Sequence, residues 1–390
     1  MRALAIVRQQ LHRRMQFLHA KRRAAIFRCL EGVIRGGRLW LTGLGRDLPG
    51  RTSDKHRVKA VDRLLGNSAI HRALPALYQV FAHWLLGGNR HPVILIDSTG
   101  LTTTAWEFRA ALCFAGRALP LYSEIHPARQ MDPALLRTFL RRLATILPAG
   151  YQPTIVTDAG FHFSWFTAVH ALGWNFVGRI RNNTKILVGS QWVSNKELHR
   201  QASARSQDLG QVPVRKRSAL AIRLVLAKKR TSKRRVRKTA LGRPGQRTID
   251  RRCEAAAREP WLLATNLELP SDAIVGIYAR RMQIEESIRD SKSHRHGWAL
   301  SYARSNSHER LAVLVFLGAL ATVIAHVAGL AAERMDLHRR FQSNTVRNRR
   351  VLSLFTLGRR ILAIGIRLPA HRLRDALAAI RSRAGDVSFA

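Results

Sequence analysis

The stretch IYARRMQIEESIRDSKSHRHGW, Ile277 to Trp298, carries a tyrosine, an arginine, a glutamate and a lysine at positions 278, 281, 285 and 292. We predict that it forms a single helix. At about 100° per residue, these four side chains fall within a stripe roughly 60° wide, whereas Glu286 points about 100° away from Glu285. One carboxylate therefore shares a helix face with two cations and a phenol, which suits a metal ion beside a phosphate. The alternative is a solvated helix face with i,i+4 ion pairs.

Two aspartates upstream favour the first reading. The segment HPVILIDSTG ends a β-branched run at Asp97, and YQPTIVTDAGF ends a second run at Asp158. Small or glycine residues follow both, so each carboxylate is expected at the end of a strand. A lone aspartate there is more often a turn or helix cap. The pair together with Glu285 instead predicts a three-carboxylate site.

The spacing Y-x2-R-x3-E-x6-K is met without a gap by Tyr278, Arg281, Glu285 and Lys292. The sequence resembles the DDE transposases of bacterial insertion sequences, in the subgroup marked by this signature and called the insertion-sequence-four family. Four shorter stretches resemble that family in the same order, and the resemblance spans roughly residues 50 to 360. They are KHRVKAVDRLLGN (55–67), GRALPLYSE (116–124), TDAGF (157–161) and PWLLATNL (260–267).

This resemblance implies a DNA transposase that cleaves at the terminal inverted repeats of its element and joins the exposed 3′-hydroxyl ends to target DNA. Asp97, Asp158 and Glu285 would be both the catalytic residues and the metal ligands. Carboxylates suit Mg²⁺, with Mn²⁺ as a substitute, and two ions per site are expected. The expected partner is double-stranded DNA, both transposon ends and target, bound by a homodimer in the synaptic complex.

The other signature residues are predicted to contact DNA. Arg281 and Lys292 would hold phosphates of the terminal nucleotides, and Tyr278 would donate a hydrogen bond to a phosphate. A core phenol is the alternative for Tyr278. Trp261 matches the family position that holds a flipped base, although a core tryptophan is the competing interpretation. Further candidates are two arginines of the segment NFVGRIR, Arg179 and Arg181.

Composition independently points to nucleic acid. The chain has 67 Lys+Arg against 24 Asp+Glu, a formal net charge of +43, which predicts a polyanionic partner. Its basic residues are spread along the chain without a juxtamembrane cluster, so no membrane partner is expected. One run, KKRTSKRRVRK (228–238), is a candidate DNA-backbone contact or a solvated loop. Its named candidates are Lys228, Lys229, Arg230, Lys233, Arg234 and Arg235.

Several features bear on compartment. Three dispersed cysteines without a CxxC pair favour a reducing cytosol and no zinc site. The N-terminus lacks an uninterrupted apolar stretch, so we expect a cytoplasmic, nucleoid-associated protein.

His294 and His296 resemble a metal-binding pair but have no third ligand nearby, and they are predicted to be DNA contacts or surface residues. The apolar segment Leu311 to Ala332 is long enough to span a membrane, but we predict a buried helix.

The expected fold class is α/β: a ribonuclease-H-like catalytic core, with a mixed sheet flanked by helices, interrupted by a mostly β insertion and preceded by a helical region. Residues 1–90 are predicted to be helical and to bind DNA. Residues 91–181 form the first part of the core, in the order β-β-β-α-β-α-β. Within it, WEFRAALCFAG and RALPLYSEIH are predicted to form an antiparallel hairpin joined at Gly116-Arg117, and a capped helix is predicted to start near Asp132. Residues 182–260 form the insertion, 261–335 the second part of the core with the signature helix, and 336–390 a basic helical region.

Two other classes of function stay open. A ribonuclease-H-like metal-dependent nuclease without strand transfer would explain the carboxylates but would not require the full signature. A non-catalytic basic DNA-binding protein would explain the charge but not the three carboxylates. Metal-dependent cleavage and strand transfer separate the three classes.

Overall fold

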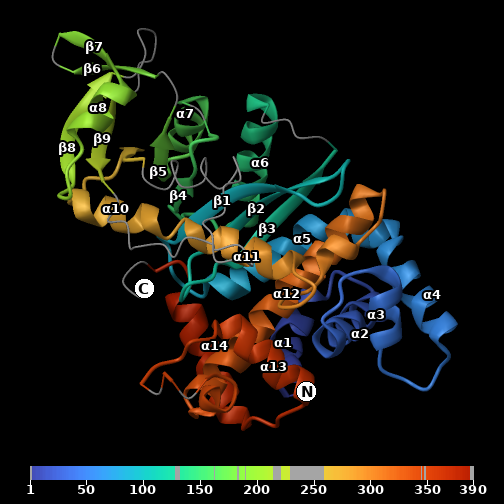
Figure 1. The fold of residues 1–390 in the computed structure, drawn as a ribbon. Coiled ribbons are helices and arrows are strands. Elements are labelled where there is room, and N and C mark those ends of the chain that lie inside the picture. The colour runs from blue at the N-terminus through green and yellow to red at the C-terminus, as the bar shows by residue number, and fades with distance from the viewer. Residues whose placement is uncertain are drawn as a thin grey trace, which may run out of the picture. The chain divides into compact units, whose positions relative to one another are not determined.

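The computed structural model describes residues 2–127, 132–161, 163–181, 184–188, 190–213, 221–228, 259–343, 345–346 and 348–386 of the 390-residue chain. The chain divides into two compact units (Figure 1). The first unit comprises Met1–Thr154 and Arg280–Ala390, and the second comprises Ile155–Ala279. Residues far apart in sequence therefore build the first unit together.

The first unit begins with helices, as predicted for residues 1–90. They are α1 (Arg2–His12), the short 3-10 helix η1 (Arg13–Met15), α2 (Ala20–Gly36), α3 (Leu41–Asp47), α4 (Asp54–Leu65) and α5 (Ser68–Leu86). Helix α4 has Asp54 in its first turn, and Gly66 follows its last residue as the C-cap. Its buried residues Val61, Leu64 and Leu65 form one apolar stripe, so packing on its neighbours stabilises the helix.

Three antiparallel strands follow: β1 (Val93–Gly100), β2 (Trp106–Leu112) and β3 (Leu119–His126), in the spatial order β3-β2-β1. Strands β2 and β3 form the predicted hairpin. Its turn contains Gly116 with φ +81°, a conformation that glycine adopts without a Cβ penalty. Helix α6 (Pro133–Ile146) is capped by Asp132, whose carboxylate accepts a hydrogen bond from the Ala134 amide at 2.9 Å.

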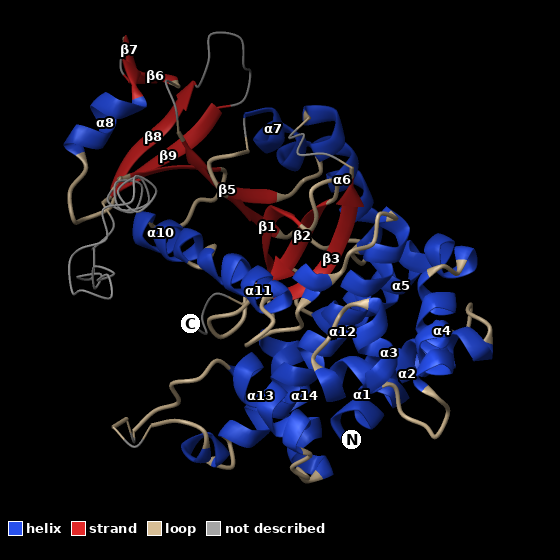
Figure 2. Ribbon diagram, turned by 45° about the vertical axis from the view of Figure 1, so that its right-hand side comes forward, coloured by secondary structure: helices blue, strands red, loops and turns tan. Residues whose placement is uncertain are grey.

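The rest of the first unit is helical: α11 (Met282–Lys292), η2 (Leu300–Tyr302), α12 (His308–Glu333), η3 (Leu337–Arg340), α13 (Leu354–Ile364) and α14 (Ala370–Arg383). Helix α12 is long and apolar enough to cross a membrane, but 94% of its most apolar window is buried. It packs on β3 and on helices from both ends of the chain, including α2, α5, α13 and α14 (Figure 2). The prediction of a buried helix is confirmed.

The contact between α12 and α13 depends on glycines. A Cβ on Gly358 would lie 1.7 Å from the carbonyl oxygen of Ala325, and one on Gly329 would lie 2.0 Å from that of Leu354. Backbone atoms cannot yield to such an overlap by rotating a side chain. The two helices therefore need glycine at both positions to approach this closely.

We expect Gly358→Ala to lower the free energy of unfolding by at least about 1–3 kcal/mol, the usual cost of overpacking a core. Urea unfolding followed by circular dichroism measures the change. Gly88→Ala is the control, since a Cβ there meets nothing within 4 Å. Equal stability of the two variants would contradict the close approach of α12 and α13.

The second unit contains β4 (Thr154–Thr157), α7 (Phe163–Ala171), β5 (Asn175–Ile180), β6 (Lys185–Val188), β7 (Gln191–Ser194), α8 (Asn195–Gln201), β8 (Gln207–Pro213), β9 (Ala221–Ala227), β10 (Trp261–Thr265) and α10 (Ser271–Ala279). Its strands follow the order β4-β5-β10-β9-β8, and β6 and β7 form a separate hairpin. The predicted order β-β-β-α-β-α-β is thus found from β1 to β5.

In the described part of the predicted insertion, β6 and β7 form a two-stranded sheet of their own, whereas β8 and β9 do not. Strand β9 pairs antiparallel with β10, and β8 pairs with β9, so both extend the sheet that β5 and β10 begin. The sequence predicted the strands but not their partners, because strand pairing depends on contacts between distant segments. Helix α8 was not predicted, although its capping box of Ser194 and Glu197 is visible in the sequence.

Candidate active site

Asp97 lies within β1, not at its end as predicted. The strand continues to Gly100 because each residue up to that point pairs with β2, with Asp97 opposite Arg109 and Thr99 opposite Glu107. Residues two apart on a strand point to the same face. These four side chains therefore share one face of the hairpin sheet, and Asp97 is half-buried there.

A buried ion pair lies on this face. Arg109 Nε is 2.7 Å from Glu107 Oε1, and the side chains are only 3% and 0% exposed. Glu107 also accepts a hydrogen bond from Ser123 Oγ at 2.8 Å, and Arg109 donates one to Ser291 Oγ of α11 at 3.0 Å. Both charges are thus compensated, as buried charges must be. This pair was not predicted, although Glu and Arg two residues apart in the otherwise apolar stretch WEFRAAL are visible in the sequence.

Lys292 connects the end of α11 to β1. Its ammonium group donates to Thr99 Oγ1 at 2.5 Å and to the carbonyl oxygen of Gly100 at 2.6 Å. Burial lowers the pKa of Lys292, while the nearby carboxylates of Glu107 and Asp97 act to raise it. The structure therefore brings two predicted site residues, Asp97 and Lys292, into one electrostatic environment.

The signature segment is not one helix. Helix α10 ends at Ala279 and α11 begins at Met282. Between them the backbone tightens, with i→i−3 hydrogen bonds from Gln283 to Arg280 at 2.9 Å and from Ile284 to Arg281 at 3.1 Å. The predicted single stripe therefore holds only from residue 281 onward. Tyr278 lies before the break, on α10.

Glu285 and Arg281 form an i,i+4 ion pair of 2.5 Å, with the Glu285 side chain 39% exposed. Glu286 instead contacts Arg289 at 2.8 Å and Arg117 at 3.2 Å. The prediction that neighbouring Glu285 and Glu286 point in different directions is confirmed. Glu285 shares its stripe with Arg281 and Lys292 because the three positions lie within about 40° around the helix axis.

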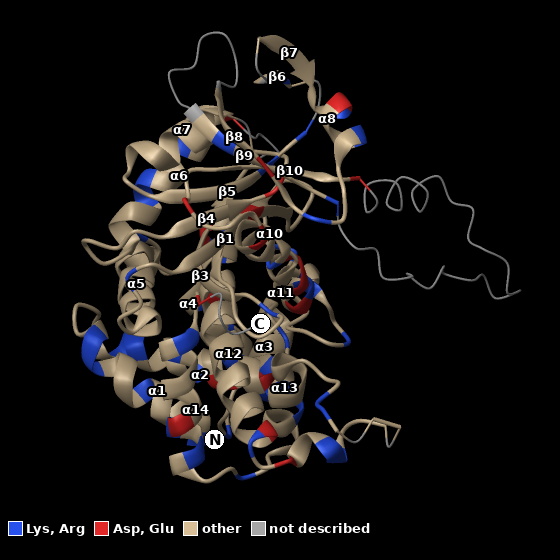
Figure 3. Ribbon diagram, turned by 90° about the vertical axis from the view of Figure 1, so that its left-hand side faces the viewer, with Lys and Arg blue, Asp and Glu red and all other residues tan. Residues whose placement is uncertain are grey.

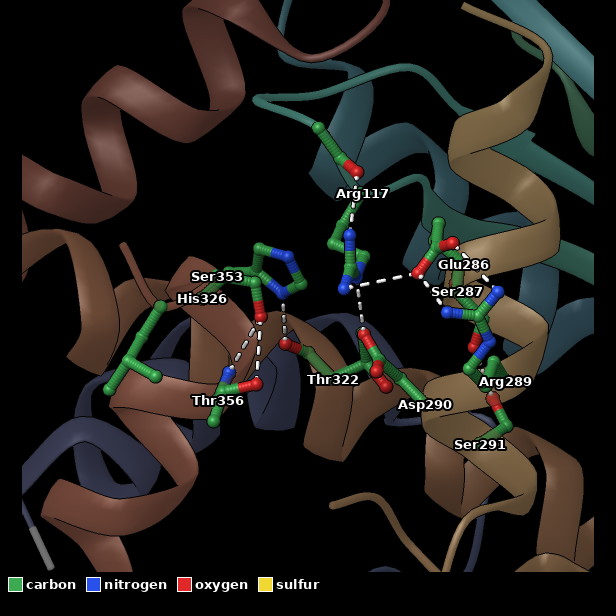
Figure 4. Close-up of polar contacts among 12 residues, drawn as sticks. Arg117, Glu286, Ser287, Arg289, Asp290, Ser291, Thr322, His326, Ser353 and Thr356 are labelled. Carbon is green, nitrogen blue, oxygen red and sulfur yellow. Dashed lines mark hydrogen bonds and ion pairs between the residues drawn. The ribbon is translucent and has the colours of Figure 1, made fainter. Parts of the chain in front are cut away.

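Arg117, in the loop that joins β2 and β3, fixes another side of α11 (Figure 4). Its guanidinium contacts Glu286 and also donates to Asp290 Oδ2 at 2.8 Å. Gln283 adds two links, accepting from the Phe114 amide through its side chain at 2.8 Å and from the Ala118 amide through its backbone at 3.1 Å. Together with Lys292, these contacts set the rotation of α11 and hence the direction of its carboxylates.

We expect Arg117→Ala to lower the rate of DNA cleavage by about 10–100-fold with little change in DNA affinity, because small displacements of a catalytic group are costly. Burial raises the pKa of Asp290 and Arg117 opposes this rise, so the variant also loses the positive charge that counters the effect of burial. A higher Mg²⁺ concentration at half-maximal rate would show that a metal-binding carboxylate of α11 has been displaced.

Arg289→Gln is the matched control for Arg117→Ala. Arg289 pairs with the same Glu286, but its side chain is 68% exposed. If both variants behave alike, the loop joining β2 and β3 has no role in positioning α11.

In the second unit, Asp158 directly follows β4, as predicted for a strand-end carboxylate. Its Oδ1 accepts a hydrogen bond from the Gly160 amide at 2.8 Å, and the residue is half-buried. This contact closes a short turn after the strand. The predicted backbone setting of Asp158 is confirmed.

Trp261 and Tyr278, also in the second unit, pack edge-to-face with ring centroids 4.9 Å apart. Tyr278 is 4% exposed, so its ring lies in the core. Arg179 and Arg181 converge on Glu259, at 2.9 Å and 2.7 Å. Their observed partners are thus within the protein, and their predicted contacts with DNA stay predictions.

The basic run at 228–238 lies outside the described residues except for Lys228. That residue is exposed, and its amide donates a hydrogen bond to the carbonyl oxygen of Ser203 at 3.2 Å.

Of the three cysteines, Cys253 also lies outside the described residues, and Cys29 and Cys113 are free and buried. Burial raises the pKa of each of these two thiols to about 12, so they are not reactive groups. His294 and His296 are exposed.

The carboxylates suit a divalent metal ion chemically, since all three offer hard oxygen ligands. Within the described residues no group of three or more His, Cys, Asp and Glu lies close enough to hold a metal ion. The first unit supplies Asp97 and Glu285, each beside a cation of α11 or the turn before it, and the second unit supplies Asp158.

An α/β fold that presents carboxylates on a strand and on a cationic helix suits enzymes that act on phosphodiesters with divalent metal ions. A family model for the transposase DDE domain matches residues 88–321, and the chain belongs to this family. DDE domains have a ribonuclease-H-like fold, which confirms the predicted fold class. They generally depend on divalent metal ions.

Among solved structures, the chain is similar to the piggyBac transposase in a synaptic complex with hairpin DNA, determined by cryo-electron microscopy. The sequence identity is 12% and the TM-score 0.37, and the match covers 88% of this chain and 66% of that chain, just under two thirds. No curated protein matches the chain.

Proposed function

We propose that this transposase belongs to the insertion-sequence-four type with the Tyr-Arg-Glu-Lys signature, and that it moves its element by a cut-and-paste route. It binds the terminal inverted repeats, hydrolyses the phosphodiester at each end and joins the 3′-hydroxyl ends to target DNA. The observation that carries the proposal is the link from Lys292 on α11 to Thr99 and Gly100 on the strand of Asp97. It joins the signature segment to the first predicted catalytic aspartate.

Asp97, Asp158 and Glu285 are the proposed ligands of two Mg²⁺ ions, with Mn²⁺ as a substitute. Two such ions, when bound, provide an activated oxygen nucleophile and neutralise charge on the attacking and leaving oxygens. In this structure the Glu285 carboxylate pairs with Arg281 at 2.5 Å.

Arg281 and Lys292 are proposed to hold the phosphates of the terminal nucleotides. Both lie on the stripe of Glu285, and Lys292 is close enough to Asp97 to be influenced by its charge. Trp261, Tyr278, Arg179 and Arg181 remain proposed DNA contacts of the second unit. A homodimer in the DNA-bound complex and a cytoplasmic, nucleoid-associated location complete the proposal.

The net charge of +43 supports double-stranded DNA as the partner. Figure 3 shows Lys and Arg on helices from both ends of the chain and on α11, not in a single segment. Such a distribution favours a broad contact with the DNA backbone, whose affinity falls steeply as salt increases.

The test uses the purified protein and a plasmid that carries both ends of the element. We expect end cleavage and joined products with Mg²⁺ or Mn²⁺, and complex formation without turnover in Ca²⁺, because its looser geometry does not organise an in-line attack. Cleavage without joined products would favour the nuclease alternative. Strong cleavage in EDTA would contradict the carboxylate mechanism, and binding without cleavage in any metal would favour a passive DNA-binding protein.

A further inference from the structure

Tyr302 is an exposed aromatic residue in the segment that follows α11. It is 48% exposed, and its ring is flanked by two others. The Trp40 ring centroid lies 5.4 Å from that of Tyr302, and the His294 centroid lies 5.7 Å from it, at right angles. We refer to Trp40, His294 and Tyr302 as the aromatic platform.

The backbone beneath Tyr302 is held by hydrogen bonds. Tyr302 belongs to a short 3-10 helix, and Ser301 Oγ donates to the carbonyl oxygen of Lys292 at 2.8 Å. The Leu39 amide, next to Trp40, donates to the carbonyl oxygen of Trp298 at 2.9 Å. The two segments that supply the platform are therefore fastened to each other, and its rings are presented in a fixed arrangement.

The Trp40 side chain is also held in place by neighbouring residues of its own segment. A Cβ on Gly43 would lie 2.4 Å from Trp40 Cε2, so the indole packs directly on the backbone of α3. The Arg38 guanidinium lies 5.9 Å from the centroid of the Trp40 ring, and Asp47 accepts two hydrogen bonds from Arg38, at 2.7 and 2.6 Å. An indole held this way is a rigid, electron-rich support with a cation over its ring.

We propose that the aromatic platform binds an unpaired nucleobase of DNA by stacking on Tyr302. An exposed aromatic ring among cations is the arrangement that binds single-stranded nucleic acid, since every base has a π-face and every nucleotide a phosphate. A base inside a duplex has both faces covered by its neighbours, so only an unpaired or terminal base reaches the ring.

The aromatic platform is linked by hydrogen bonds to the strand of Asp97, which supports the proposal that it binds a base. The proposal therefore rests on the proposed function of Asp97. Ser301 is bonded to the backbone of Lys292, and the side chain of Lys292 is bonded to Thr99 and Gly100 on the strand of Asp97. Cleavage at Asp97 would create DNA ends, and bases at an end unpair more easily than internal ones. The platform is thus a subsite for a base at or beside the cut.

The experiment measures binding without cleavage, in EDTA. The probe is a duplex with a single-stranded thymidine overhang that carries 2-aminopurine, whose fluorescence falls when it stacks on an aromatic ring. We expect the wild-type protein to quench the probe. We expect Tyr302→Ala to lose the quenching and to bind the overhang about 5- to 150-fold more weakly, which corresponds to the 1–3 kcal/mol of one base–aromatic stack.

Three comparisons make the result specific. Tyr302→Phe retains the ring and should retain quenching, while Phe17→Ala removes an aromatic residue that is 50% exposed elsewhere in the unit and should change nothing. Affinity for a blunt duplex should be unchanged in all variants. The proposal is overturned if Tyr302→Ala quenches normally, or if it loses affinity for blunt and overhanging DNA equally. Because no metal is present, this outcome is independent of whether the protein cleaves DNA.

Discussion

Asp97→Asn, Asp158→Asn and Glu285→Gln should each reduce end cleavage by about three orders of magnitude or more, the scale seen when a catalytic residue is removed. Each change replaces a carboxylate oxygen with an amide while keeping the side chain's size, so a metal ligand is lost with little change in packing. Binding to the ends should stay near that of the wild type, because none of the three carboxylates is a phosphate contact. Single-turnover cleavage and end-binding affinity, measured on the same preparations, separate the two effects.

Glu286→Gln is the control within α11. Glu286 is adjacent to Glu285 but contacts Arg117 and Arg289, and glutamine can still accept a hydrogen bond from either arginine. It should retain activity, as should Asp375→Asn on the exposed side of α14. An inactive Glu286→Gln beside an active Glu285→Gln would mean that the wrong side of α11 has been assigned to the metal.

Local patterns in the sequence predicted the elements well. The strand of Asp97, the hairpin with its turn near Gly116, the capped helix after Asp132 and the strand before Asp158 all occur where predicted. Each depends on interactions between residues close in sequence: a cap, a turn that needs a positive φ, or an alternating apolar run. The apolar α12 was also predicted as a buried helix, although its partners were not.

Contacts between segments that are distant in the sequence could not be predicted from local sequence patterns. The segment 277–298 has helical periodicity throughout, yet the chain breaks the helix at Arg280 and Arg281, which lie at the boundary between the two units. Charged residues are compatible with either a helix or a turn at this point. Helical periodicity alone therefore does not predict where the helix breaks. The length of β1 beyond Asp97 likewise depends on its pairing with β2, which only the folded chain defines.

The buried pair of Glu107 and Arg109 shows why the site was only partly predicted. On an isolated strand these residues would be expected to face solvent, because burying a charge is costly. Burial becomes acceptable only when Ser123 and Ser291, from β3 and α11, supply further hydrogen bonds. Those partners lie 16 and 182 residues away from the residues that they bond.

Lys292→Ala and Arg281→Ala should lower the rate of end cleavage by about 100-fold or more while end-binding affinity falls only a few-fold. Binding is shared among many cations, whereas positioning and neutralising a phosphate at the reacting end are local tasks. If the two residues only support the fold, cleavage per folded molecule stays normal and the loss appears as lower stability. For Arg281, whose partner Glu285 is 39% exposed, that loss should be about 1 kcal/mol or less.

The pH dependence distinguishes the roles of the two cations. Burial lowers the pKa of Lys292, so the folded protein loses this positive charge at a lower pH than an ordinary lysine would. Cleavage that needs the charge should therefore decline as pH rises through this lowered pKa. Lys292→Arg should move the decline to higher pH, because a guanidinium stays protonated, and Arg281→Ala should leave its position unchanged. Normal cleavage by Lys292→Ala with a reduced melting temperature would show that Lys292 only joins α11 to β1.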